Sequence, residues 1–228
     1  DVPTLPHFYG PGVAAAGISF AGSDAGESIG AEAVALQSAI RLLAPLLAGL
    51  APPPVLYLDL AGGLATQTGR QSGKMLGALW GLERLLTPAR LWIGDPAIDA
   101  GGRSDHGLLH LLLELLRARK METQIVARAG LHTLTDIEEM LAAKVAHLLV
   151  IEPARLGGLN QTFAAAEWCR TRNVGVILGG AGWGALTTAE MMVQAALALR
   201  PAALETPHFL SGAAGLLLMQ RLVAAAAA

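Results

Sequence analysis

The chain has 228 residues and a formal net charge of −2 at pH 7; 53% of its residues are hydrophobic and only 15% are charged. The near-neutral charge argues against nucleic acid or an anionic membrane as a partner, because both bind strongly positive surfaces. A single cysteine, Cys169, excludes an internal disulfide framework and indicates a reducing, cytoplasmic compartment. Charged residues interrupt the richest apolar segments, so none reaches the roughly 18 residues that a membrane-spanning helix needs.

Apolar and amphipathic segments alternate from the first residues onward. The patterns predict a strand within Val13 to Phe20, a helix over Ala31 to Leu50, a strand over Val55 to Leu60, a loop over Ala61 to Arg70, a helix over Met75 to Leu86, a strand over Leu91 to Asp95, a polar loop over Gly101 to Gly107 and a helix over Leu108 to Arg119. Proline terminates the first two helices, at Pro52 and Pro88.

The same alternation continues to the end of the chain. It predicts strands over Thr123 to Ala127, Leu148 to Ile151 and Val174 to Leu178, with helices ending at Lys144 and over Gln161 to Arg172, Thr187 to Leu199 and Gly212 to Ala228. Thr133 and Asp136 have the spacing of a capping box before the first of these helices.

Strand and helix repeat about every 25 to 30 residues, as in a (β/α)8 barrel or a doubly wound sheet. The barrel is favoured because no G-x-G-x-x-G turn follows an early strand. We count six or seven strand units. No linker divides the chain, so residues 1 to 228 are expected to form one domain.

Charged residues follow four of the expected strands. Asp59, Asp95, Arg128 and Glu152 stand at strand ends, and Arg155 and Asn160 follow Glu152 within one short segment. Polar groups at the carboxyl ends of barrel strands surround the reaction site in such folds, so these side chains are expected at the mouth. The glycine-rich turn with Gly180 and Gly182 could present backbone N–H groups to an anion, or could be a tight turn that needs positive φ.

Several short motifs together resemble the methylaspartate ammonia-lyase family of the enolase superfamily. They are Leu5-Pro6-His7, Leu58-Asp59, Asp99-Ala100-Gly101, Thr133-Leu134 with Asp136-Ile137, Leu156-Gly157-Gly158 with Asn160, and Leu178-Gly179-Gly180 after Gly175. The resemblance implies a TIM-type (β/α) barrel of the enolase superfamily that lacks the N-terminal capping domain and the first strand.

The resemblance also implies a site in which most family residues are replaced. In the family, three strand-end acids hold magnesium, and a lysine and a histidine move the proton next to a carboxylate. Asp59 matches the first acid, and His7 the histidine. Gly94 stands at the second acid, with Asp95 one place along, while Arg128 stands at the third acid and Glu152 at the lysine.

Two functions remain open at this stage. In the first, the chain is an inactive or altered relative that serves as a subunit of a larger assembly or homo-oligomer, and Arg128 forms an ion pair with Glu152 or Asp59 in place of a metal. No cofactor is favoured here.

In the second, the chain is an active carbon–nitrogen lyase for a small amino or carboxylic acid. Glu152 and His7 would be catalytic, Asp59 and Asp95 would hold any retained magnesium, and Arg128, Arg155, Asn160, Gly180 and Gly182 would bind the substrate. A carboxylate such as Glu152 is a weak base, with an ordinary pKa of about 4.3.

Overall fold

Seven parallel strands form one sheet whose spatial order is the order of the chain. The computed structural model describes residues 15–19, 29–49, 53–179, 186–205 and 212–226. The strands are β1 (Ala15–Ser19), β2 (Val55–Asp59), β3 (Arg90–Gly94), β4 (Gln124–Ala127), β5 (Leu148–Ile151), β6 (Gly175–Leu178) and β7 (Ala203–Leu204). Every neighbouring pair is parallel, so all the strands end at the same edge of the sheet.

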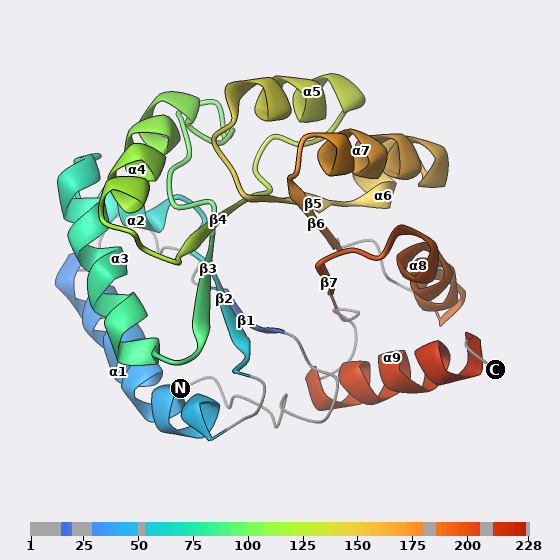
Figure 1. Cartoon of the computed structure of the whole chain (residues 1–228), viewed down its shortest axis with the longest axis horizontal. Coiled ribbons are helices and arrows are strands. Elements are labelled where there is room, and N and C mark those ends of the chain that lie inside the picture. Colours follow the sequence, from blue (N-terminus) through green and yellow to red (C-terminus); the bar gives the residue numbers. More distant parts are fainter. Residues whose placement is uncertain (1–14, 20–28, 50–52, 180–185, 206–211, 227–228) are drawn as a thin grey trace.

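The sheet is curled, and the long helices lie around its outer face (Figure 1). The helices are α1 (Ile29–Ala48), α2 (Gly63–Gln67), α3 (Ser72–Leu86), α4 (His106–Ala118), α5 (Leu134–Ala143), α6 (Pro153–Leu156), α7 (Leu159–Thr171), α8 (Leu186–Leu199) and α9 (Gly212–Ala226). None of these helices is long and apolar enough to cross a bilayer.

Apolar side chains cover both faces of the strands, which explains why the strands read as continuous apolar runs rather than as alternating patterns. The outward set packs against the helices in one large core, and the inward set forms a second cluster inside the curl. The inward cluster consists of Val55, Tyr57, Trp92, Val126, Leu148, Val150 and Ile177. Cys169 is fully buried on α7, in the large core, where burial raises the pKa of its thiol to about 12.

Most predicted elements are confirmed within a few residues, and the capping box of Thr133 and Asp136 is present at α5. The prediction of a loop over Ala61 to Arg70 was wrong, because that segment contains α2. The short helix α6 and the two-residue strand β7 were not predicted either. All three are too short to show a helical or strand period in the sequence.

Histidine chemistry gives the fold a pH dependence at the amino end of β4. His147 Nδ1 accepts a hydrogen bond from Ile125 N at 2.9 Å, which only an unprotonated nitrogen can do. Burial, with a smaller contribution from Arg117, lowers the pKa of His147 below its ordinary value. As the pH falls, His147 is therefore protonated in the unfolded chain before it is protonated in the folded chain. The stability that neutral His147 provides is present above about pH 6.5 and is lost as the pH falls below that value.

We predict that His147→Asn reduces this acid-dependent loss of stability. The measurement is the free energy of unfolding in urea at about pH 7.5 and about pH 5.5. The wild-type protein should lose more free energy between the two values than the variant does. His110→Asn is the matched control, because His110 is exposed on α4 beside Glu114. An equal loss of unfolding free energy in wild type and His147→Asn would contradict the role assigned to His147.

Candidate functional site

A polar layer lies directly above the inward apolar cluster. Successive strand residues alternate between faces, so residues two positions beyond the inward cluster share its face. For β2 to β7 these positions hold Asp59, Gly94, Arg128, Glu152, Gly179 and Glu205. They lie at the carboxyl ends of the strands, the edge at which parallel barrels build their sites.

Arg128 is the centre of this layer. Its Nη2 contacts Glu205 Oε1, its Nε lies 3.7 Å from Glu152 Oε1, and its Nη1 lies 3.8 Å from Asp59 Oδ2. Glu152 makes a second pair with Arg155, at 2.6 Å between Oε2 and Nε. The ion pairs that the sequence suggested for Arg128 are confirmed, and Glu205 is an additional partner.

Burial and charge act in opposite directions on Arg128. Its side chain is only 22% exposed, and burial lowers the pKa of a guanidinium, but the neighbouring carboxylates, Glu205 foremost, outweigh burial and hold the pKa above its ordinary value. Arg128 is therefore a permanent cation. Breaking such a buried pair costs about 3–5 kcal/mol, because the remaining charges lose their counter-ion.

Tyr57 reaches into the polar layer from below. A Cβ atom added at Gly94 would lie 2.5 Å from the Tyr57 hydroxyl, so the phenol takes the space of a side chain at position 94. Burial, followed by the charge of Asp59, raises the pKa of Tyr57 and keeps the phenol protonated. Its hydroxyl is buried without a hydrogen-bond partner among the described residues.

Asp95 anchors the loop that follows β4. Its Oδ1 accepts hydrogen bonds from Arg128 N at 3.0 Å and from Ser104 Oγ at 3.1 Å, and both of its oxygens accept from Ala129 N. Burial raises the pKa of Asp95, while these backbone bonds lower it by a smaller amount. Asp95 thus positions the backbone of Arg128 and has no oxygen without a hydrogen bond.

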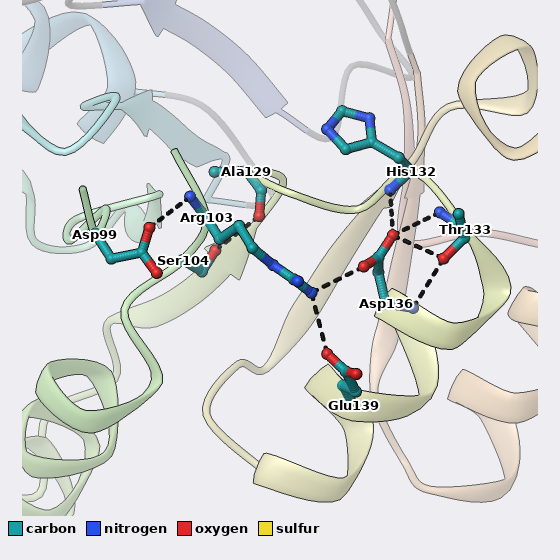
Figure 2. Close-up of polar contacts among 8 residues, drawn as sticks. All are labelled: Asp99, Arg103, Ser104, Ala129, His132, Thr133, Asp136 and Glu139. Atoms are coloured by element: carbon teal, nitrogen blue, oxygen red, sulfur yellow. Dashed lines mark hydrogen bonds and ion pairs between the residues drawn. The ribbon is translucent and has the colours of Figure 1, made fainter. Parts of the chain in front are cut away.

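A second contact holds the same loop from its other end (Figure 2). Arg103, from the loop after β3, pairs with Asp136 at 2.8 Å and with Glu139 at 3.1 Å. Gly130 has a φ of +80°, and an added Cβ would lie 2.8 Å from Arg103 Cγ. A glycine is required here because the two loops approach so closely.

The structure brings together four of the predicted site residues: Asp59, Arg128, Glu152 and Arg155. Asn160 is exposed in the first turn of α7 and takes no part in these ion pairs. His7, Gly180 and Gly182 lie outside the described residues, so their predicted roles stay predictions.

Sequence reasoning missed Tyr57 and Glu205. Tyr57 stands among the aliphatic residues of β2, and its hydroxyl was a signal in the sequence. It was missed because only the aspartate at the end of the strand was considered. Glu205 follows a two-residue strand that gives no sequence pattern. Counting two positions beyond each inward residue would have found Glu205 only after β7 was known.

The described residues do not fit a magnesium ion. Magnesium requires oxygen ligands in near-octahedral geometry. At the three positions that the resemblance assigns to metal-binding acids, only Asp59 offers a carboxylate; Gly94 offers none and is covered by Tyr57, and Arg128 is a cation. Within the described part of the chain, no three His, Cys, Asp or Glu side chains are placed to hold a metal.

Comparison with known proteins identifies the family. The family model of the methylaspartate ammonia-lyase C-terminus matches residues 21–221. The chain belongs to this family. Methylaspartate ammonia-lyase 2 of Carboxydothermus hydrogenoformans is 30% identical over 156 residues, which are 68% of this chain and 37% of the relative. The aligned part thus spans little more than a third of that curated relative.

Solved structures confirm the fold. The β-methylaspartase of Clostridium tetanomorphum, described as a magnesium complex, superimposes with a TM-score of 0.79 at 19% identity, over 91% of this chain and 50% of that chain. The methylaspartate ammonia lyase of Citrobacter amalonaticus, containing (2S,3S)-3-methylaspartic acid, gives a TM-score of 0.78 at 22% identity, over 91% and 51%. The predicted TIM-type (β/α) fold is therefore confirmed, as a curled parallel sheet that matches part of these barrel proteins.

Glycine at position 179 is predicted to be essential for the ion pair of Glu205. An added Cβ would lie 2.1 Å from Glu205 Oε2 and 2.4 Å from its Cδ, so Gly179→Ala must displace Glu205 from Arg128. We expect a loss of about 1–3 kcal/mol in the free energy of unfolding. Gly77→Ala is the control: no atom lies within 4 Å of its added Cβ, and alanine in helix α3 should stabilise by about 0.5–1 kcal/mol. Equal stability of the two variants would contradict the packing.

Proposed function

We propose that this chain is a methylaspartate ammonia-lyase-like barrel that does not catalyse the family's metal-assisted elimination and acts instead as a subunit of a larger assembly. The observation that carries the proposal is the guanidinium of Arg128 among Asp59, Glu152 and Glu205 at the strand ends. A fixed cation at this place repels a divalent metal and offsets part of the negative charge that would attract one.

The residue at the position of the family lysine supports the same proposal. Glu152 is 5% exposed and interacts with both Arg128 and Arg155. The two arginines engage both carboxylate oxygens of Glu152, and a carboxylate so engaged is poorly placed to accept a carbon-bound proton.

The alternative is an active carbon–nitrogen lyase for a small amino or carboxylic acid. One observation favours it: Arg128 and Arg155 stand together at the strand ends, and Arg155 is 44% exposed, so a substrate carboxylate could reach a guanidinium. In this alternative Glu152 and His7 would move protons, and Asp59 and Asp95 would hold any retained metal.

We predict that this protein does not bind magnesium at the strand ends and does not deaminate 3-methylaspartate. Calorimetric titration with millimolar magnesium should give no saturable heat, because the guanidinium of Arg128 lies between the carboxylates and repels a divalent cation. Ultraviolet detection of the unsaturated diacid should give no rate above that of buffer. Both measurements use the longest natural polypeptide that contains this chain. A negative result then cannot be attributed to a missing segment.

The Clostridium tetanomorphum and Citrobacter amalonaticus enzymes are the positive controls for metal and substrate, respectively. A heat of magnesium binding that disappears in Asp59→Asn would contradict the first part. Production of the diacid that is lost in Glu152→Gln would contradict the second part and favour the active lyase.

The proposed assembly is supported by apolar surface and by the sheet. The outer faces of α1, α3 and α4, which are neighbours in Figure 1, expose Leu42 (68%), Leu46 (66%), Trp80 (51%) and Leu111 (51%). In the described sheet, β1 and β7 each pair on one side only. Unpaired strand edges and clustered apolar side chains are features that soluble proteins cover.

The partner in this proposal is a second copy of the chain or another polypeptide, and no membrane or nucleic acid is involved. The assembly is placed in the cytoplasm, where the buried thiol of Cys169 would stay reduced.

We predict that the chain of 228 residues buries an apolar contact on the order of 2,000 Å² or more against another polypeptide chain. Light scattering should give a mass above that of a monomer, and Leu42→Glu with Leu46→Glu should reduce that mass. Leu217→Glu is the matched control, because Leu217 is 50% exposed on α9. A stable monomer that unfolds cooperatively would refute the assembly.

A further inference from the structure

Two buried groups in the polar layer have no hydrogen-bond partner among the described residues. They are the hydroxyl of Tyr57 and Nε of Arg128. Tyr57 as a whole is only 9% exposed. Nearly all buried polar groups in proteins have a partner, because leaving one unpaired costs its full desolvation energy. Two such groups in one layer therefore require an explanation.

The two groups lie in the same part of the layer, beside Asp59. The Tyr57 hydroxyl lies over Gly94, 2.5 Å from the position of an added Cβ, and Gly94 pairs with Asp59 in the sheet. Among charged groups, Asp59 and then Arg128 have the largest effects on the pKa of Tyr57, and such effects weaken with distance. Nη1 of Arg128 in turn lies 3.8 Å from Asp59 Oδ2. The phenol and the guanidinium are therefore neighbours.

The ion pair of Arg128 with Glu152 has the length at which water commonly bridges two polar groups. Nε lies 3.7 Å from Glu152 Oε1, whereas N–H···O hydrogen bonds measure about 2.7–3.2 Å, so this pair has no direct hydrogen bond. Polar contacts longer than about 3.5 Å are often completed by a water molecule. A water oxygen to one side of the line between the two atoms reaches both at about 2.8 Å.

The unpaired groups also determine what kind of molecule fits. Nε of Arg128 can only donate, so the occupant must accept a hydrogen bond and cannot be a metal ion or an ammonium. Asp59, Glu152 and Glu205 would repel an anion. Water is neutral, accepts and donates, and typically makes about three hydrogen bonds when buried. Solvent reaches the layer, since the side chains of Asp59 and Glu205 are 17% exposed.

We propose that Tyr57, Arg128 and Glu152 form a binding site for one ordered water molecule. The water oxygen accepts hydrogen bonds from the Tyr57 hydroxyl and from Nε–H of Arg128, and the water donates one proton to Glu152 Oε1. It thereby connects Arg128 to Glu152, which have no direct hydrogen bond. The site goes beyond the proposed function, since the same water would be bound in an inactive protein and in an active lyase.

Tyr57→Phe tests the site, because it removes the hydroxyl and little else. If water is bound, the variant loses a hydrogen bond, and its melting temperature should fall by about 2–4 °C. If the hydroxyl is truly unpaired, the substitution removes an unfavourable buried group, and a melting temperature equal to or above that of wild type would overturn the proposal. Thr123→Val is the positive control and should also lower the melting temperature, because the buried hydroxyl of Thr123 donates to Glu83.

A double-mutant cycle tests whether Tyr57 and Arg128 share the water. Arg128→Lys keeps the charge and removes Nε–H. Residues that bind one water are coupled, so the shift caused by Tyr57→Phe should differ between the wild-type and Arg128→Lys backgrounds. The shift should be unchanged in Arg103→Lys, because Arg103 pairs with Asp136 and Glu139 instead. Equal shifts in wild type and Arg128→Lys would contradict a shared water.

A high-resolution crystal structure of the wild-type protein identifies the bound atom directly, and it provides the decision if Arg128→Lys does not fold. The expected result is a single density peak within about 3.2 Å of both Tyr57 Oη and Arg128 Nε. The absence of such a peak would refute the site. A Tyr57 hydroxyl that donates directly to a protein atom, such as an oxygen of Asp59, would refute it as well, even if Tyr57→Phe lowers the melting temperature.

Discussion

The buried charge of Arg128 is the constraint on which the upper layer of the barrel depends. Asp59, Glu152 and Glu205 approach one another at the strand ends only because a cation lies between them. Their mutual repulsion would be strong here, where water screens charges poorly. Asp95 supports the same arrangement from the backbone side, since it holds the N–H of Arg128 and so fixes where the side chain begins.

Two glycines make room for this layer. Gly94 on β3 lies beneath the hydroxyl of Tyr57 from the neighbouring β2, and Gly179 after β6 lies against the carboxylate of Glu205, which follows the neighbouring β7. In both places one strand contributes a residue without a side chain and its neighbour contributes a long polar one. Each glycine thus leaves the space that the long polar side chain of its neighbour occupies.

The sequence was sufficient for the repeating architecture and for four of the six residues that meet at the site. Periodicity and proline positions located the long helices and the buried strands, because these signals extend over many residues. Arg128, Glu152 and Asp59 were found because each directly follows a recognisable apolar strand. Tyr57 was missed because an aromatic residue in an apolar strand is normally core, and the position of Glu205 depends on a strand pairing that only the fold reveals.

The residues of this layer depend on one another through shared charge and shared space. A carboxylate introduced at Gly94 alone would collide with Tyr57. An acid in place of Arg128 alone would add a further negative charge beside Asp59, Glu152 and Glu205. Residues that share one charge network and one packing space show strong non-additivity, so single substitutions in this layer are expected to be destabilising. The polar layer is therefore one coupled network of charge and packing, and a change at one of its positions alters the fit of the others.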